Sequence, residues 1–323
     1  MDNQLISEHP HISVVICTRN RCDQVKKVLE SAAKLNIAKG LVWELILVDN
    51  GSTDATQSVA ASFKHLLPIR VVVEAQAGLS NARNRGLLEA RGDYICWTDD
   101  DVTLDVNWLN AYAQAFKDFP EASVFGGRID PEFEGDLPDW WVSSGSRLDP
   151  LLGKRYIGET YCEITGHEED MPFGANFALR RHDLGELRFD PQLGVGPSRR
   201  RLGEESTMMW ALLTRGGKGI WVPGARVVNP VPRARLSKDY VGEYHQGNGE
   251  TDAYLYVVGF WDGKPKTQFE LLARTIRISV AIPFHYCRYR FLRISQSAHE
   301  WVPAWVDYNV RKGMFAYFKR AFR

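Results

Sequence analysis

The chain has 323 residues, of which 44% are hydrophobic and 25% are charged, and its formal net charge is zero. This is the composition of an ordinary globular protein with enough apolar residues for a large core. A net charge of zero gives no support to nucleic acid as a partner, and we expect none. The five cysteines are scattered without a CxxC pair, which favours reduced thiols over a zinc site or a disulfide framework.

The chain shows no sequence signal for secretion or for membrane insertion. Its first residues, "MDNQLISEHPHIS", lack a basic stretch followed by an apolar core, and the apolar runs are too short to cross a bilayer. Together with the cysteine pattern, this predicts a cytoplasmic protein without a signal peptide or a transmembrane helix.

Strand-like and helix-like segments alternate through the first 125 residues. Apolar, β-branched runs predict strands, and apolar residues three and four positions apart predict helices. The expected strands are 12–17, 43–48, 69–73, 94–97 and 122–125, and the expected helices are 23–33, 54–63, 79–90 and 107–116. Such alternation with nearly all-apolar strands predicts an α/β protein with a mostly parallel sheet covered on both faces.

The rest of the chain is less regular. Residues 128–170 are rich in Gly, Pro, Trp and acids, and so long a loop in a compact domain usually has a function. A strand, a helix and two short strands around a Pro-Gly turn are expected at 171–181, 204–213 and 219–229. From about residue 237 the sequence becomes helical, aromatic and basic.

Three adjacent aspartates, Asp99, Asp100 and Asp101, follow the apolar run "DYICW" after a single threonine. Ligands of parallel α/β sheets bind beyond the carboxyl ends of the strands. Adjacent carboxylates repel one another, and the sequence places no fixed positive partner beside them. Mg²⁺ or Mn²⁺ bound to a diphosphate would relieve the repulsion, since both ions prefer oxygen ligands. The alternative is a solvated acidic turn.

A second alternative is a phosphohydrolase, because "DDDVT" fits the Asp-x-Asp-x-Thr pattern of enzymes whose first aspartate is a nucleophile. That fold needs a later Gly-Asp-x-x-x-Asp metal motif, and "GEESTMM" lacks both of its aspartates. It would also leave the preceding strand–helix units without a role.

Six segments, in this order, resemble family 2 glycosyltransferases of the GT-A fold: "VVICTRNR", "ELILVDNGSTD", "GLSNARNRGLLEARGDYICWTDDDV", "GANFALRR", "LGEEST" and "VPGARVVNPVP". The resemblance implies a Rossmann-like, mixed and mostly parallel sheet flanked by helices. It also implies a catalytic domain at 1–235 followed by a helical, basic C-terminal region at 236–323. The implied activity is inverting transfer of a sugar from a nucleotide-diphosphate donor, with a UDP-sugar expected, to a hydroxyl of a glycan or lipid-linked saccharide. A nucleotide-sugar-binding protein without catalysis is the alternative.

The resemblance implies nucleotide-binding roles at the strand ends. Asp49 would read the nucleotide base, and Thr18 and Asn20 would face the same base and the ribose. Arg83 would help to organise the nucleotide and the acidic motif. The alternative, an arginine on the surface, is stronger for Arg85 than for Arg83.

By the same resemblance, Asp99 contacts the ribose side and Asp101 binds a divalent metal (Mn²⁺ or Mg²⁺), with Asp99 as the second candidate ligand. Asp100 lies between them and belongs to the expected nucleotide-sugar site. The family often has a histidine after the "VP-x-A-x-V" strand, where this sequence has Asn229. The metal would then depend on Asp101, the diphosphate and water. His245 is the candidate substitute, and the alternative is a surface histidine in a loop.

Glu204 and Glu205 fall on the family's Glu-Asp pair, whose second residue is the general base that removes the proton of the acceptor hydroxyl. That residue is Glu205 here rather than an aspartate, and the longer side chain leaves Glu204 as the alternative base. The structural alternative is that both acids complement the dipole of the helix that they open.

Two aromatic features carry further expectations. Trp140 and Trp141 form either a wall beside the acceptor or a plug of the core. On a helix, Phe315, Phe318 and Phe322 share a face that basic residues flank, which is typical of an interfacial helix. We therefore expect an anionic membrane surface as a partner, on the inner face of the cell membrane. The alternative is a helix packed on the catalytic domain.

Overall fold

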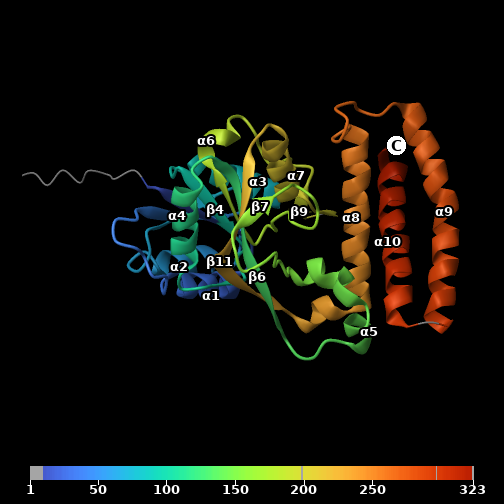
Figure 1. Ribbon diagram of the computed structural model, residues 1–323, viewed down its shortest axis with the longest axis horizontal. Helices are drawn as coiled ribbons and strands as arrows, with labels where there is room; N and C mark the ends of the chain where they lie inside the picture. Colours follow the sequence, from blue (N-terminus) through green and yellow to red (C-terminus); the bar gives the residue numbers. More distant parts are fainter. Residues whose placement is uncertain (1–9, 198, 296, 322–323) are drawn as a thin grey trace, which may run out of the picture. The chain divides into compact units, whose positions relative to one another are not determined.

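A computed structural model describes residues 10–197, 199–295 and 297–321 (Figure 1). The chain forms two compact units. The first comprises Met1–Glu132, Gly153–Gln192 and Glu204–Pro230, and the second comprises Phe133–Leu152, Leu193–Gly203 and Val231–Arg323. The division at residue 235 that the sequence suggested stays a prediction.

A mixed, mostly parallel sheet is the centre of the first unit, in the order β3-β2-β1-β4-β8-β6-β11-β5, with β7 beside β11. Its strands are β1 (Ile12–Thr18), β2 (Trp43–Asp49), β3 (Ile69–Val73), β4 (Tyr94–Thr98), β5 (Thr103–Leu104), β6 (Ala122–Phe133), β7 (Cys162–Ile164), β8 (Asn176–Arg180) and β11 (Lys218–Val231). Strand β1 pairs in parallel with β2 and β4, whereas β8 runs antiparallel to β4 and β6. The predicted α/β fold class is confirmed.

Helices cover both faces of this sheet because its strands are apolar on both sides. Val14 and Ile16 of β1 belong to one buried cluster, and Val15 between them belongs to another. The first cluster includes side chains of α1 and α4, and the second includes side chains of α3 and α7. The helices are α1 (Cys22–Ala32), α2 (Thr56–Ser62), α3 (Leu79–Glu89), α4 (Trp108–Asp118), α6 (Arg181–Leu184) and α7 (Glu204–Thr214).

Strand β11 corrects one prediction. Sequence reasoning placed two short strands around the Pro-Gly turn at 223–224, but one strand runs through it from Lys218 to Val231. Different strands pair with its two ends, β7 near Ile220 and β5 near Val227. Tertiary pairing therefore overrides the local turn signal.

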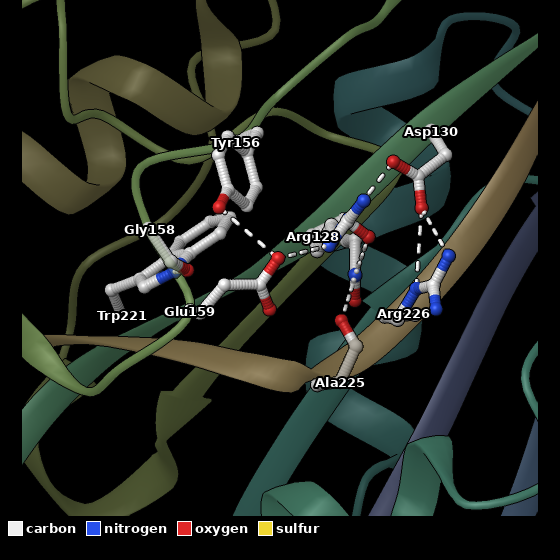
Figure 2. Close-up of polar contacts among 9 residues, drawn as sticks. Arg128, Asp130, Tyr156, Gly158, Glu159, Trp221, Ala225 and Arg226 are labelled. Carbon is white, nitrogen blue, oxygen red and sulfur yellow. Dashed lines mark hydrogen bonds and ion pairs between the residues drawn. The ribbon is translucent and has the colours of Figure 1, made fainter.

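Polar side chains tie the segment after Gly153 to β6 and β11 (Figure 2). Arg128 on β6 pairs with Asp130 at 2.9 Å and with Glu159 at 3.0 Å, and its guanidinium lies over the ring of Tyr156. Arg226 on β11 pairs with Asp130 from the other side at 2.8 Å. Part of the region predicted to be irregular is thus held in place on the sheet.

The second unit is built on three long helices, as the sequence predicted for this region: α8 (Lys238–Val258), α9 (Gln268–Ser295) and α10 (Ala298–Ala321). Helix α10 packs against both α8 and α9 (Figure 1). Glycines permit the close crossing of α8 and α10, because a Cβ on Gly249 or Gly313 would lie 1.9 Å from a backbone oxygen of the facing helix. The unit also contains α5 (Asp139–Val142), the 3₁₀ helices η1 (Gly145–Leu152) and η2 (Arg233–Leu236), and the hairpin of β9 (Gly194–Gly196) and β10 (Arg199–Arg201).

The two tryptophans of α5 pack inside this second unit. Trp141 is buried, and the ring of Trp140 lies 6.0 Å from those of Trp301 and Trp305 on α10. Of the two interpretations of Trp140 and Trp141, the structure therefore favours the plug over a wall beside the acceptor.

The predicted membrane face of α10 is wrong for the residue at its centre. Phe318 is fully buried, and Phe315 is half-buried in the same cluster as Leu271 and Ile278 of α9. Phe322 lies outside the described residues. Because α10 packs against helices on two sides, it has too few free positions for an apolar face towards a membrane. No described helix combines the length and apolar character needed to cross a bilayer.

Replacing Phe318 with alanine is consequently expected to destabilise the helical unit by about 3–5 kcal/mol, the usual cost of truncating a buried phenylalanine. The matched control is Phe284→Ala on α9, whose side chain is exposed and should change stability by less than about 0.5 kcal/mol. Denaturant unfolding followed by circular dichroism measures both. Equal unfolding midpoints for the two variants would contradict the buried position of Phe318. Removal of residues 314–323 should likewise lower the melting point.

Candidate active site

The expected site residues meet at one edge of the sheet in the first unit. Thr18 and Asp49 are directly paired at the ends of β1 and β2, and β4 ends beside β1 just before the three aspartates. Because these strands are parallel, their carboxyl ends share one edge, where α/β sheets bind their ligands.

Two of the three aspartates share one arginine as their partner. Arg21, from the loop after β1, donates to Oδ1 of Asp100 and to Oδ2 of Asp101, both at 2.7 Å. Thr18 Oγ1 donates to the other oxygen of Asp100, also at 2.7 Å. Burial raises the pKa of Asp100 to about 6, although Arg21 and the Thr18 hydroxyl act in the opposite direction. Arg21 was missed by sequence reasoning, although it lies within the motif "VVICTRNR".

Asp99 has a second arginine, Arg83, as its partner. Its Oδ1 lies 4.0 Å from Nη2 of Arg83, and its side chain stays 43% exposed. Partial desolvation, and next the charge of Asp101, raise the pKa of Asp99. Additional positive charge close to Asp99 and Asp101 would therefore be favourable.

Arg83 on α3 connects the acidic motif with the glutamate pair. It is buried, and its Nη1 lies 2.8 Å from Oε1 of Glu204 and 3.5 Å from Oε2 of Glu205. Its guanidinium also lies over the rings of Phe177 and Phe189, which exclude water. The neighbouring Arg85 is 40% exposed and pairs with Glu89 of its own helix. Arg85 is therefore a surface arginine, whereas Arg83 is not.

The two glutamates have different surroundings. Burial, and next the charge of Glu205, raise the pKa of Glu204 to about 8, while Arg83 acts in the opposite direction. Glu205 accepts the backbone N–H of Gly174 through Oε1 at 3.1 Å, and its Oε2 has no hydrogen bond within the described ranges. Gly174 is needed for this approach, because a Cβ there would lie 2.5 Å from Arg83 Nη2. Gly174 is a second residue that sequence reasoning missed.

Asp49 and Asn20 organise the loops after β2 and β1. Asp49 is fully buried and accepts hydrogen bonds from the Ser52 backbone N–H and the Gln57 side chain. Asn20, with a positive φ of 53°, accepts the backbone N–H of Thr53 at 2.7 Å. These contacts fix both loops next to each other at the edge of the sheet.

The residues considered for the metal do not form one cluster. No group of three or more His, Cys, Asp and Glu side chains suited to a metal occurs within the part of the chain that the structure describes. Asn229 is buried on β11 near Gly153. His245 lies on a buried face of α8 in the second unit, not in the surface loop considered as the alternative.

Comparison with known proteins decides the family. The model of the family described as "Glycosyl transferase family 2" matches residues 13–187, more than half of the chain. The chain belongs to glycosyltransferase family 2. The match includes the "DDDVT" segment, so the acidic motif lies in the family's own domain, and this speaks against the phosphohydrolase interpretation.

Curated relatives resemble this family 2 glycosyltransferase over most of its length. The succinoglycan biosynthesis protein ExoM of Rhizobium meliloti is 24% identical over 252 residues, which cover 77% of this chain and 76% of ExoM. The glucosyl-dolichyl phosphate glucuronosyltransferase of Haloferax volcanii is 23% identical over 271 residues, covering 81% of this chain and 78% of that enzyme.

Solved structures share its fold. The mannosyltransferase PcManGT of Pyrobaculum calidifontis, in complex with GDP-Man and Mn²⁺, has a TM-score of 0.58 at 18% identity, covering 98% of this chain and 87% of that one. Residues 1–349 of TarS from S. aureus, in complex with UDP-GlcNAc, give 0.53 at 17% identity, covering 96% and 92%. At these identities the likeness establishes the expected GT-A fold and nothing finer.

Proposed function

We propose that this family 2 glycosyltransferase transfers a sugar, with inversion, from a nucleotide-diphosphate donor to a hydroxyl of a glycan or lipid-linked saccharide. The observation that carries the proposal is the position of buried Arg83, which lies within 4.0 Å of Asp99 on one side and of Glu204 and Glu205 on the other. A donor-side carboxylate and a candidate base are thereby held at one place.

The nucleotide would lie along the edge that Thr18, Asn20 and Asp49 form. Both oxygens of Asp49 already accept hydrogen bonds, from Ser52 and from Gln57, so Asp49 would read a base N–H by sharing one of them. The nucleotide sugars named with the structural neighbours, UDP-GlcNAc and GDP-Man, support this class of donor. The relatives named for succinoglycan and dolichyl-phosphate chemistry support a polysaccharide or lipid-linked acceptor.

Glu205 is the proposed general base. A base must accept a proton from the acceptor hydroxyl at hydrogen-bond distance. Glu205 Oε2 has no hydrogen bond in the described part of the chain, but it is buried and lies 3.5 Å from Arg83 Nη1, so the carboxylate would turn towards the acceptor to take the proton. Glu204 is less suited, because it is buried and its Oε1 is held by Arg83 at 2.8 Å. Attack by the activated acceptor oxygen on the anomeric carbon gives inversion without a covalent enzyme intermediate.

A divalent cation fits the oxygen ligands present, although the acidic motif offers only two carboxylates for it. Asp99 and Asp101 are adjacent acids, and the pKa of Asp99 is raised partly by the charge of Asp101. Both would hold Mn²⁺ or Mg²⁺, with diphosphate oxygens and water as further ligands, and the ion would neutralise the leaving diphosphate. Arg21 already binds Oδ2 of Asp101, so it would have to share or yield that oxygen.

A donor panel tests the proposal. UDP-, dTDP- and GDP-sugars are incubated with the protein and Mn²⁺, with and without a chelator, and slow donor hydrolysis is measured. We expect hydrolysis of one nucleotide class, most readily UDP-sugars, that the chelator abolishes. Donor binding without hydrolysis or transfer to any acceptor would instead favour a nucleotide-sugar-binding protein without catalysis.

Asp101→Ala is expected to reduce the affinity for UDP with Mn²⁺ to the value measured with a chelator, because it removes one of the two proposed metal ligands. The fold should persist, since the pair of Asp101 with Arg21 is partly exposed and the change relieves repulsion among the three adjacent aspartates. Calorimetry measures the affinity. The control, Asp23→Ala, removes the same charge from the exposed first turn of α1 and should change nothing. Chelator-insensitive, unchanged affinity in Asp101→Ala would refute the metal role.

A further inference from the structure

The outward face of α9 carries an apolar stripe along the whole helix. The exposed residues that form this α9 stripe are Phe269, Leu272, Ile276, Val280, Phe284, Phe291 and Ile294. They recur every three, four or seven positions, so they share one side of the helix. Their exposure is high, at 79% for Phe269, 72% for Val280 and 84% for Ile294.

The stripe is not the face that holds α9 in the fold. Leu271, Ile278 and Tyr289 on the opposite side are buried and belong to the clusters that join α9 to the rest of the helical unit. In Figure 1, α10 lies between α8 and α9, in agreement with the packing of α10 on both. Folding of the helical unit therefore does not need the α9 stripe, and an exposed apolar surface of this kind is typical of a binding site.

The charge beside the stripe is almost entirely positive. Helix α9 contains five arginines and one acidic residue, Glu270. With 3.6 residues per turn, Arg277 and Arg288 fall on one flank of the stripe, and Arg290 and Arg293 fall on the other. All four are exposed. Such a face repels a second copy of itself and attracts an anionic surface.

A hollow of about 260 Å³ adjoins the first turns of the stripe. Its walls are Tyr256, Phe269, Glu270, Ala273, Arg274 and Arg277. The guanidinium of Arg274 lies 5.1 Å from the centre of the Tyr256 ring, which holds it at the wall of the hollow. Two arginines at one hollow suit a phosphate oxygen cluster, because guanidinium groups bind phosphate through paired hydrogen bonds.

We propose that the α9 stripe is the face on which this protein rests on an anionic phospholipid membrane. The apolar side chains would enter the boundary between headgroups and acyl chains, while the flanking arginines meet lipid phosphates. An anionic membrane matches both the exposed apolar stripe and the positive charge on its two flanks. The proposal is independent of the proposed function, and it moves the membrane contact from α10 to α9.

Vesicle flotation of the full chain tests the apolar half of the proposal. The combined variant Ile276→Gln, Val280→Gln and Phe284→Gln should bind anionic vesicles about a hundredfold or more weakly, since three apolar side chains no longer leave water. These side chains are exposed, so the melting point should not change. The matched control replaces three exposed apolar residues elsewhere, Leu66→Gln, Leu88→Gln and Val142→Gln, and should bind like the parent.

A second variant tests the contribution of the positive charge. Replacing Arg277, Arg288 and Arg290 by glutamine should weaken binding to anionic vesicles about a hundredfold, from roughly a factor of five per basic residue near such a surface. Binding by the parent should also fall as salt is raised. The control replaces the exposed Lys34, Lys39 and Lys64 by glutamine and should leave binding unchanged.

Cys287 offers a readout without mutation, because it is exposed on the same side of α9 as the stripe. Its alkylation by a water-soluble maleimide, followed peptide by peptide with mass spectrometry, should slow on addition of anionic vesicles, whereas that of Cys22 should not. Equal binding to neutral and anionic vesicles, or equal binding by the stripe variant and its control, would overturn the proposal. So would a parent that forms dimers through α9 and binds no vesicles.

Discussion

Glu205→Gln is expected to lower sugar transfer by about two to four decades while donor affinity stays unchanged. Glutamine keeps the shape of the side chain and can still accept the Gly174 N–H through its amide oxygen. It cannot take the proton of the acceptor hydroxyl. Because Glu205 contributes nothing to the proposed nucleotide edge, the loss should lie in kcat, which steady-state kinetics with a saturating donor measures.

Glu204→Gln is the matched control for the base, since it makes the same chemical change one residue away. The Glu204 carboxyl is buried and held by Arg83 at 2.8 Å, so it is not available to the acceptor hydroxyl and the loss should be smaller. A larger loss in Glu204→Gln would assign the base to Glu204. Near-normal turnover in both variants would remove the glutamate pair from catalysis.

Arg83→Met is expected to destabilise the first unit by about 3–5 kcal/mol, the usual result of removing one partner of a buried ion pair. Methionine approximates the length of the arginine stem, so the lost charge dominates the effect. Glu204 would be left buried without its cation, and Glu205 would lose the nearest positive charge. Denaturant unfolding of the whole chain, followed by a far-ultraviolet signal, gives the change in midpoint.

The control for Arg83 lies two residues away on the same helix. Arg85→Met removes a partly exposed pair with Glu89 and should change stability by less than about 1 kcal/mol. The double variant Arg83→Met with Glu204→Gln should recover part of the lost stability, because neither partner is then left charged alone. Equal destabilisation by Arg83→Met and Arg85→Met would show that the buried ion pairs of Arg83 stabilise the fold no more than the exposed pair of Arg85.

The sequence by itself determined the sheet and the edge on which the site lies. Strands such as β1 and β2 lie where apolar, β-branched runs predicted them, because a strand covered on both faces is apolar along most of its length. Their polar ends then had to meet at one edge. The acidic motif and the glutamate pair could therefore be selected from the sequence, although their chemical roles remain proposals.

The tertiary structure alone decided which side chains share a charge or a face. Arg21 pairs with Asp100 and Asp101, which lie about eighty positions later in the sequence. Arg83 pairs with Glu204, which is even farther away in the sequence. No local pattern encodes such contacts. The phenylalanines of α10 and those of α9 look alike in sequence, yet Phe318 is buried and Phe284 is exposed. Amphipathic spacing shows that a helix has an apolar side, but only packing against neighbours determines whether protein or solvent meets that side.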